Sequence, residues 1–505
     1  MTRQTESGNM LYYGDNLDIL RRYIPDESVD LVYLDPPFNS NATYNILFAE
    51  QDGNRAAAQI KAFGDTWQWD QAAIKAHQEI VEAGGKASIA MQSFRQFLGD
   101  NNMLAYLSMM APRLLELRRV LKSTGSIYLH CDPTASHYLK MLMDAVFEAG
   151  NFGNEIIWNY GARATVRQSG FPGKHDVLFR YTKTSKCIFN KLFVKYKDES
   201  MGRYNKVDGQ GRRYALIKRT RSATGETYYG KCYPSEGAPM TDVWSIPTMA
   251  STDKERLGYP TQKPEALLER IIKASSNEGD VVLDPFCGCG TTIAVAQRLK
   301  RRWIGIDITQ AAMKVIKVRL RDAFGDAVQY EIIGEPVSVP DAQVLADTKP
   351  YQFQWWALGL AFFDARPAEG EGKKGADKGV DGRGYFHDEP QGGKTKQIVF
   401  SVKAGHTNVA HVRDLRGVLE RDKAEIGVLL TMQEPTRPMR AEAAGAGFYD
   451  SPWGTRHPKM QIITVGQLLE GKMVDMPPSR DVRTFKKARR IKHRRLDTPP
   501  FLQTE

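Results

Sequence analysis

Continuous apolar runs alternate with segments of helical period along the first third of the chain. Short runs of apolar and β-branched residues, bounded by glycine, proline or charged residues, predict strands covered on both faces of a parallel sheet. Longer segments with apolar residues three and four positions apart predict amphipathic helices between these strands. The expected strands lie within 31–34, 124–132 and 154–160, and the expected helices within 103–122 and 137–150, with a helix-prone aromatic stretch through 71–90.

Residues 161–257 interrupt this pattern with short β-prone pieces, many glycines and arginines, and scattered tyrosines. Strand and helix alternation returns over 264–309, so both segments are expected to build one doubly wound α/β fold. The predicted parts are a first domain over 1–333, a connector over 334–350, a second, smaller α/β domain over 351–470, and a basic tail over 471–505.

The length and the net charge of the chain indicate how many domains to expect and which kind of partner. A chain of 505 residues is too long for one compact core, which agrees with two domains. The net charge of +11 favours an anionic partner, with nucleic acid as the first choice. The N-terminus is polar, no apolar run reaches membrane-spanning length, and the five cysteines are sparse. These features predict a cytoplasmic protein without membrane association.

The first candidate motif directly follows a buried strand. Asp35-Pro36-Pro37-Phe38 comes after the apolar run 31–34, and neither proline can donate a hydrogen bond to a sheet. The acid and the ring are therefore expected at the carboxyl edge of the sheet, where open α/β folds bind ligands. The alternative is a turn that only ends a strand.

A second motif has the layout of a nucleoside-cofactor site. Strand 281–283 leads into Asp284-Pro285-Phe286-Cys287-Gly288-Cys289-Gly290, and a helix is expected to begin at Thr291. The glycines permit positive φ and a close approach of the backbone to a ligand. Asp307 ends the next strand, where a carboxylate can bind ribose hydroxyls. An acid at the position of Asp284 suits a cationic or zwitterionic cofactor better than a diphosphate, and the two cysteines are interpreted as small loop residues.

These motifs, in this order, resemble the S-adenosylmethionine-dependent DNA amino-methyltransferases of the β group, to which Type III modification enzymes belong. The resemblance covers about the first two thirds of the chain and implies a Rossmann-like methyltransferase sheet with 161–257 as an inserted target-recognition region. It implies double-stranded DNA as substrate, a role in restriction–modification or phage defence in a prokaryote or phage, and a homodimer. The implied cofactor-binding residues are Asp15, Thr261, Gln262, Lys263, Asp284, Pro285, Phe286, Gly288, Gly290 and Asp307.

The resemblance also implies the chemistry of the first motif. Asp35 and the carbonyl of Pro36 would each accept one N–H of an exocyclic base amine, Pro37 would keep that carbonyl rigid, and Phe38 would stack on the flipped base. An acid in first position favours N6 of adenine over N4 of cytosine, which stays the alternative. Cytosine C5 methylation is excluded because no Pro-Cys pair exists. Trp158 or Tyr160 is interpreted as a second aromatic of the base pocket or as core.

The second domain resembles the Mrr-like branch of the PD-(D/E)XK nucleases. Asp381 in a glycine-rich turn and Ser401-x-Lys403 on the next strand have the spacing of a Mg²⁺-dependent site, with Asp381 as the metal ligand. Ser401 departs from the usual acid or amide at its position. The hypotheses are therefore a bifunctional protein that cleaves DNA and a nuclease fold that is kept for binding DNA. The basic run at 483–495 is expected to attract phosphates.

Overall fold

The computed structural model describes most of the chain, and the account below concerns this part alone. The described residues are 8–37, 43–49, 55–64, 68–161, 171–194, 196, 201–220, 227–234, 237–250, 252–259, 261–362, 365–367, 379–388 and 395–478. Phe38 and the basic run at 483–495 lie outside these ranges, so the predictions made for them are not examined further.

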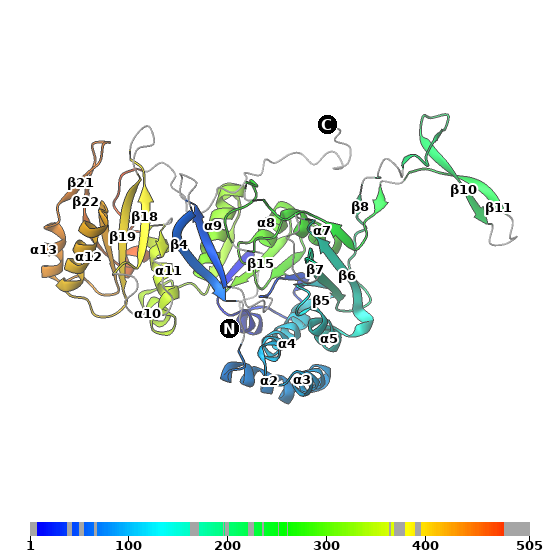
Figure 1. Ribbon diagram of the computed structural model, residues 1–505, viewed down its shortest axis with the longest axis horizontal. Helices are drawn as coiled ribbons and strands as arrows, with labels where there is room; N and C mark the ends of the chain where they lie inside the picture. The colour runs from blue at the N-terminus through cyan, green and yellow to red at the C-terminus, as the bar shows by residue number, and fades with distance from the viewer. Residues whose placement is uncertain are drawn as a thin grey trace.

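A nine-stranded sheet forms the centre of the molecule (Figure 1). Its strands, in spatial order, are β13 (Val243–Ser245), β6 (Phe152–Asn159), β7 (His175–Thr182), β5 (Leu121–Cys131), β2 (Val29–Leu34), β14 (Val281–Asp284), β15 (Arg302–Asp307), β1 (Asn9–Tyr13) and β16 (Tyr330–Ile333). Only β7 runs antiparallel to its neighbours, and the remaining pairs in this sheet are parallel. Strands from both ends of the first domain therefore lie side by side at the middle of the sheet.

Helices cover both faces of this sheet because its strands are apolar on both sides. On β2, Leu31 and Tyr33 pack into one buried cluster, whereas Val32 and Leu34 pack into the other. The first cluster includes α7 (Glu265–Ser275), α8 (Thr291–Arg298) and α9 (Gln310–Phe324). The second includes α1 (Asn16–Tyr23), α4 (Asn102–Val120) and α5 (Ser136–Phe147), with α2 (Gln71–Ala83) and α3 (Gly85–Leu98) packed outside them. The predicted Rossmann-like, doubly wound α/β fold is confirmed.

The segment after β2 differs from the sequence prediction. A hairpin of β3 (Thr43–Ala49) and β4 (Arg55–Gly64) precedes α2, in a segment for which no strand was predicted. Single-turn helices η1 (Ala149–Asn151) and η2 (Gly325–Ala327) follow α5 and α9. The helices and strands expected at 103–160 and 264–309 are present with shifts of a few residues at their ends.

The insertion after β7 builds an arm that projects from the body of the molecule (Figure 1). Its base pairs β8 (Phe193–Val194) with β12 (Ala238–Pro239), and its outer part is a sheet of β9 (Lys206–Val207), β10 (Arg213–Thr220) and β11 (Thr227–Cys232). Most residues of β10 and β11 are exposed on both faces of the hairpin. Most side chains of the β10–β11 hairpin are therefore not part of a core.

A second sheet lies in the C-terminal third. Its order is β17 (Arg366–Pro367), β18 (Gly382–Phe386), β19 (Lys396–Lys403), β20 (Ile426–Thr431) and β23 (Met460–Thr464). The first three strands are antiparallel and the last three parallel, with α12 (Val409–Asp422) and α13 (Arg437–Ala444) as the crossovers. A small pair, β21 (Phe448–Asp450) and β22 (Arg456–Pro458), and a short helix α14 (Val465–Leu469) complete it.

The predicted connector at 334–350 is largely helical. Helix α10 (Val339–Thr348) begins at the N-cap Ser338, whose hydroxyl accepts from the backbone of Asp341, and it buries Leu345. It leads directly into α11 (Pro350–Ala361), which packs against α9 of the first domain and β19 of the second sheet. The two parts of the chain are thus joined by packed helices and not by a loose linker. None of the helices in the described ranges is long and apolar enough to cross a membrane.

Candidate active site

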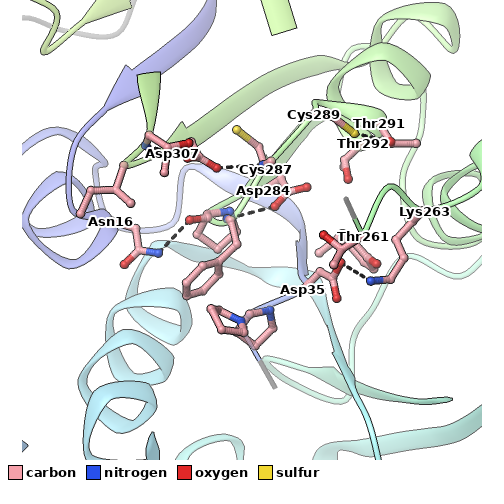
Figure 2. A pocket seen from close by; sticks show the side chains of 18 of the residues that line it. Asn16, Asp35, Thr261, Lys263, Asp284, Cys287, Cys289, Thr291, Thr292 and Asp307 are labelled. Atoms are coloured by element: carbon pink, nitrogen blue, oxygen red, sulfur yellow. Dashed lines mark hydrogen bonds and ion pairs between the residues drawn. The ribbon is translucent and has the colours of Figure 1, made fainter. Parts of the chain in front are cut away.

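Two strand ends meet at the middle of the nine-stranded sheet. Strands β2 and β14 are parallel neighbours, with Leu31 opposite Val282 and Val32 opposite Leu283. Asp35 and Asp284 therefore emerge at the same carboxyl edge, although they lie far apart in the sequence. A cavity of about 300 Å³ opens between them (Figure 2). Its size is at the lower end of the range for small-molecule sites.

The cavity collects nearly all of the predicted methyltransferase residues. Those that line it are Asp15, Asp35, Pro36, Pro37, Thr261, Gln262, Lys263, Asp284, Pro285, Phe286, Gly288 and Asp307. Gly290 is not part of the lining. It begins α8 with φ +72, and a Cβ there would lie 2.9 Å from Ile316, so glycine allows close packing of α8 on α9.

Asp35 presents one satisfied and one unsatisfied oxygen. Its Oδ2 accepts from the ammonium of Lys263 at 2.6 Å, a contact visible in Figure 2. Its Oδ1 is buried and has no hydrogen-bond partner among the described residues. A buried acceptor without a donor is costly, which makes this oxygen a place for a donor from a ligand. Lys263, predicted as a cofactor residue, lines the cavity and contacts the Asp35 carboxylate.

The cofactor-loop glycine is positioned by Asp307. Gly288 has φ +48, and its backbone N–H donates to Asp307 Oδ2 at 2.9 Å. The other oxygen of Asp307 accepts from the backbone and the hydroxyl of Thr309, both at 2.8 Å. Asp307 thus connects the loop after β14 to the start of α9 while it lines the cavity. Each carboxylate oxygen has two lone pairs, so acceptor capacity is left for a ligand hydroxyl.

Burial raises the pKa values of the two carboxyls on this side of the cavity. Desolvation raises the pKa of Asp284 to about 7, and the charges of Asp35 and Asp307 add to that effect against hydrogen bonds from Thr292 and Phe286. Burial likewise raises the pKa of Asp307 to about 6, against the hydrogen bonds from Thr309 and Gly288. A positive charge in the cavity would favour the ionised form of both groups.

The wall beside α1 includes two residues that the sequence did not indicate, Asn16 of α1 and Arg113 of α4. Asp15 is the N-cap of α1, accepting from Leu17 N at 2.8 Å, and its other oxygen pairs with Arg113 at 2.8 Å. Asn16 accepts from Arg113 at 2.5 Å and donates to the carbonyl of Pro285 at 2.8 Å. Asp15, Asn16 and Arg113 therefore link α1, α4 and the cofactor loop. No local motif marks Arg113, which belongs to a helix.

The opposite wall is a strained turn before α7. Thr261 has φ +60, an unusual conformation for a β-branched residue, and lines the cavity. The side chain of Gln262 accepts from Leu257 N at 2.9 Å and donates to Glu255 O at 2.8 Å. Gln262 therefore holds the turn in shape, and Thr261 and Lys263 on either side of it face the cavity.

A buried polar row behind Asp35 was not recognised in the sequence. His130 on β5 lies between Tyr33 on β2 and Asp176 on β7, and its side chain is fully buried. Trp158 packs edge-on against His130 at 5.5 Å, and its indole N–H donates to Ile246 O at 2.8 Å. With 3% of its surface exposed, Trp158 is observed as a core residue. Tyr160 donates to Asp176 at 3.4 Å.

The predicted nuclease residues do come together at the second sheet. Asp381 Oδ2 accepts from Ser401 Oγ at 3.1 Å, from Val402 N at 2.7 Å and from Lys403 Nζ at 3.3 Å. Its Oδ1 accepts from Gln354 of α11 at 2.9 Å. Both oxygens are thus engaged by protein donors. Among the described residues, no group of three or more His, Cys, Asp or Glu side chains has an arrangement suited to a metal ion.

Two families match the chain. Residues 29–318, more than half of its length, match the family described as DNA methylase. Residues 365–470 match the family described as NACHT-associated inactive Restriction Endonuclease 1. The first match contains Asp35 and Asp284, and the second contains Asp381, Ser401 and Lys403.

Individual relatives match parts of the chain. The Type II methyltransferase M.HpaI of Haemophilus parainfluenzae is 33% identical over 226 residues, which are 45% of this chain and 63% of that protein. The DNA adenine methyltransferase YhdJ of Escherichia coli (strain K12) is 26% identical over 315 residues, 62% of this chain and 83% of YhdJ. A putative DNA modification methylase from Thermus thermophilus, solved with S-adenosyl-L-methionine, covers 65% of this chain and 100% of its own, with 16% identity and a TM-score of 0.35. The chain thus spans less than two thirds of the length of M.HpaI.

Proposed function

We infer that this chain, which belongs to the DNA methylase family, transfers a methyl group from S-adenosylmethionine to an exocyclic amine of a base in double-stranded DNA. The observation that supports this most directly is the Asp35 carboxylate, whose buried Oδ1 has no partner among the described residues and belongs to the cavity shared with the Asp284 loop. An amine N–H is the kind of donor that this oxygen lacks.

The cavity suits the proposed cofactor. S-adenosylmethionine, when bound, supplies its methyl group from a positively charged sulfonium. Asp284 and Asp307 place two carboxyls in the cavity whose ionised forms a cation would favour. Gly288 keeps the loop open for close approach of a ligand, and Asp307 has acceptor capacity for ribose hydroxyls. Asp15, Thr261 and Phe286 would complete the binding site from the surrounding walls.

Asp35 and Pro36 would prepare the amine for reaction. The lone pair of a base amine is delocalised into the ring, so the amine is a weak nucleophile. Two acceptors, Asp35 Oδ1 and the Pro36 carbonyl, would hold its two N–H groups and direct the lone pair at the methyl donor. Pro36 and Pro37 both line the cavity and restrict the backbone there, so little reorganisation is needed.

We propose N6 of adenine as the methylated atom, with N4 of cytosine as the alternative. The acid in first position of the motif supports adenine, as does the relative YhdJ, whose name describes a DNA adenine methyltransferase. The test is mass spectrometry of nucleosides from DNA incubated with the enzyme and cofactor. N6-methyladenine is expected as the main product. N4-methylcytosine would overturn the base assignment alone, and no methylated base would overturn the function.

The arm is proposed to contact the DNA as part of a target-recognition region over 161–257. Strands β10 and β11 carry Arg213, Lys218, Arg219 and Lys231, and neither strand contains an acidic residue. A two-stranded ribbon has dimensions that fit the major groove. Exposed basic residues with Tyr228 and Tyr229 between them suit phosphate contacts and base edges. Site-specific methylation of this kind supports a role in restriction–modification.

The second domain is proposed to bind DNA without cleaving it. Protein donors engage both oxygens of Asp381, its neighbour Ser401 is a weak metal ligand, and the matching family is described as inactive. Plasmid incubated with Mg²⁺ or Mn²⁺ is expected to stay intact at enzyme concentrations that methylate it fully. Cleavage that disappears in Lys403→Ala would show instead that the protein is bifunctional.

A further inference from the structure

Three neighbouring strands place a row of polar side chains behind the catalytic motif. Asp35 follows β2, His130 lies near the end of β5, and Asp176 lies near the start of β7, which runs in the opposite direction. His130 Nδ1 lies 3.6 Å from Asp35 Oδ1, and its Nε2 lies 3.1 Å from Asp176 Oδ2. A fully buried imidazole thus stands between two carboxylates.

The hydrogen-bond partners of His130 determine which of its ring nitrogens carries the proton. Burial by itself would raise the pKa of Asp176, but the hydrogen bond and charge of His130, together with Lys263, hold that pKa below its ordinary value. Asp176 is therefore ionised and can only accept, so the proton of the imidazole is on Nε2. Burial and the charges of Asp35, Asp284 and Asp176 raise the pKa of Tyr33 well above its ordinary value. Its hydroxyl therefore keeps its proton and donates it to Nδ1 at 3.0 Å.

The remaining surroundings of His130 do not change this assignment. From β6, the ring of Trp158 covers one side of the imidazole, and Tyr160 donates to Asp176 at 3.4 Å. From the turn before α7, Lys263 is paired with Asp35. The acceptor nitrogen of His130 therefore lies within 3.6 Å of the unsatisfied oxygen of Asp35.

Methylation of an amine leaves one proton to be removed. As the N–CH₃ bond forms and the S–CH₃ bond breaks, the neutral amine nitrogen becomes positively charged. It must then lose one proton to give the neutral methylamine. Asp35 Oδ1 would hold that N–H from the start and is the first acceptor, but the site is closed to bulk water on this side because His130 is fully buried.

We propose that His130 and Asp176 form a proton relay behind Asp35, which takes the proton released after methyl transfer. The proton would pass from Asp35 Oδ1 to His130 Nδ1 as the Tyr33 hydroxyl turns away, and Asp176 would stabilise the resulting imidazolium. Asp35 is thereby restored as a carboxylate while the product still occupies the cavity. After the product has left, Nδ1 returns this proton through Asp35, whose side chain is 16% exposed, to water in the cavity, so that Nε2 keeps its own proton and the ring returns to its resting form. This inference rests on the proposed function, and His130 and Asp176 act through Asp35 as positioning residues.

The position of the proton on His130, beside Asp176, can be tested without measuring methylation. In the full-length protein with ¹⁵N-labelled histidine, the resonances lost in His130→Gln identify His130. They are expected to show a neutral ring with the proton on Nε2 at pH 8, and Asp176→Asn should change that pattern. A charged ring, or a proton on Nδ1, would contradict the relay whatever the protein does to DNA.

The role of the row is tested by single-turnover methylation across pH. Asp176→Asn keeps a similar shape and should slow methyl transfer on the order of 100-fold, the scale of lost acid–base assistance. His130→Gln should slow it similarly and change the pH dependence of the rate, because the second acceptor of the row is lost. Cofactor affinity by calorimetry should stay near wild type in both variants, which also shows that they are folded.

Ser126→Ala is the matched control, because Ser126 is buried on the same strand β5 and is outside the row. It should keep the wild-type rate and pH profile. Wild-type rates and profiles in His130→Gln and Asp176→Asn would overturn the relay. A wild-type protein that shows the expected NMR pattern but methylates no DNA would instead overturn the proposed function.

Discussion

At the residue scale, two carboxyls at the ends of neighbouring strands have different roles in this cavity. Asp35 has an ammonium partner on one oxygen and an unsatisfied second oxygen, which suits an acceptor for a substrate N–H. Asp284 is buried against the cofactor loop, where burial raises its pKa to about 7. Two acids in different surroundings, one directed at an amine and one at a cation, are what the proposed transfer requires.

Asp35→Asn is predicted to remove methyl transfer while it preserves the cavity. The amide is similar in size but replaces one acceptor with a donor, so it repels an amine N–H. The single-turnover rate should fall on the order of 100- to 1,000-fold, as for loss of one preorganised polar group. Asp26→Asn is the control, because its exposed carboxylate precedes β2 at the opposite end. A rate near that of wild type with normal cofactor affinity would remove Asp35 from catalysis.

Cofactor binding is predicted to release protons at mildly acid pH. Because the folded pKa of Asp284 is raised, the free protein loses stability as pH rises from about 4 through about 7. A bound cation favours the ionised form, so affinity should increase with pH over that range and level off above it. Calorimetry at pH 6.5 in two buffers of different ionisation enthalpy measures the release.

The release of protons on cofactor binding should largely disappear in Asp284→Asn. It should also disappear in the wild type at pH 9, where Asp284 is already ionised. Asp307, with a pKa raised to about 6, accounts for the remainder. Binding enthalpies that are the same in both buffers at pH 6.5 would show that neither carboxyl changes its protonation when the cofactor binds.

At the scale of elements, local signals predicted the strands and the glycine loop, whereas long-range contacts were not predictable. The buried run 31–34 and the turn 284–290 carry their own structural signals in composition and period. Lys263 and Asp35 are 228 residues apart, so their pairing depends on how β2, β14 and the turn before α7 assemble. The same holds for His130 and Asp176. Helix α10 did have a local start signal, Ser338 followed by Pro340, which the prediction of a connector over 334–350 did not use.

The arm is predicted to contribute affinity through its charges. Lys218 lies opposite Tyr229 and Lys231 opposite Leu216, and these four residues share one face of the β10–β11 hairpin. Replacing both lysines with alanine should lower the slope of log affinity against log salt by about 2, because each phosphate contact contributes about 0.9. Cofactor affinity should not change. Lys75→Ala with Lys86→Ala, on exposed positions of α2 and α3, is the matched control. Equal slopes in both double variants would exclude the arm from DNA binding.

For the whole molecule, the two sheets share one continuous core. Helix α11 inserts Phe353 and Trp356 into the same buried cluster as Met313 and Ile316 of α9 and as Phe400 of β19. Gln352 also accepts from the first backbone N–H of α9 at 3.1 Å, beside the loop that Asp307 holds. The cofactor loop and the second domain are thus connected through one helix, so truncation at residue 350 would remove part of the core of the first domain.

Trp356→Ala is therefore predicted to destabilise the entire chain and not the second domain alone. Trp356 is 4% exposed, and truncating a buried aromatic side chain leaves a cavity that costs about 3–5 kcal/mol. Because the cluster spans both sheets, thermal unfolding should remain one transition at a lower temperature, and bound cofactor should raise that temperature for the whole protein. Val344→Ala, at a position of α10 that is 62% exposed, should change stability by less than about 0.5 kcal/mol. Two separate transitions, with only one shifted by Trp356→Ala and the other by cofactor, would show that the two domains fold independently despite their common helix.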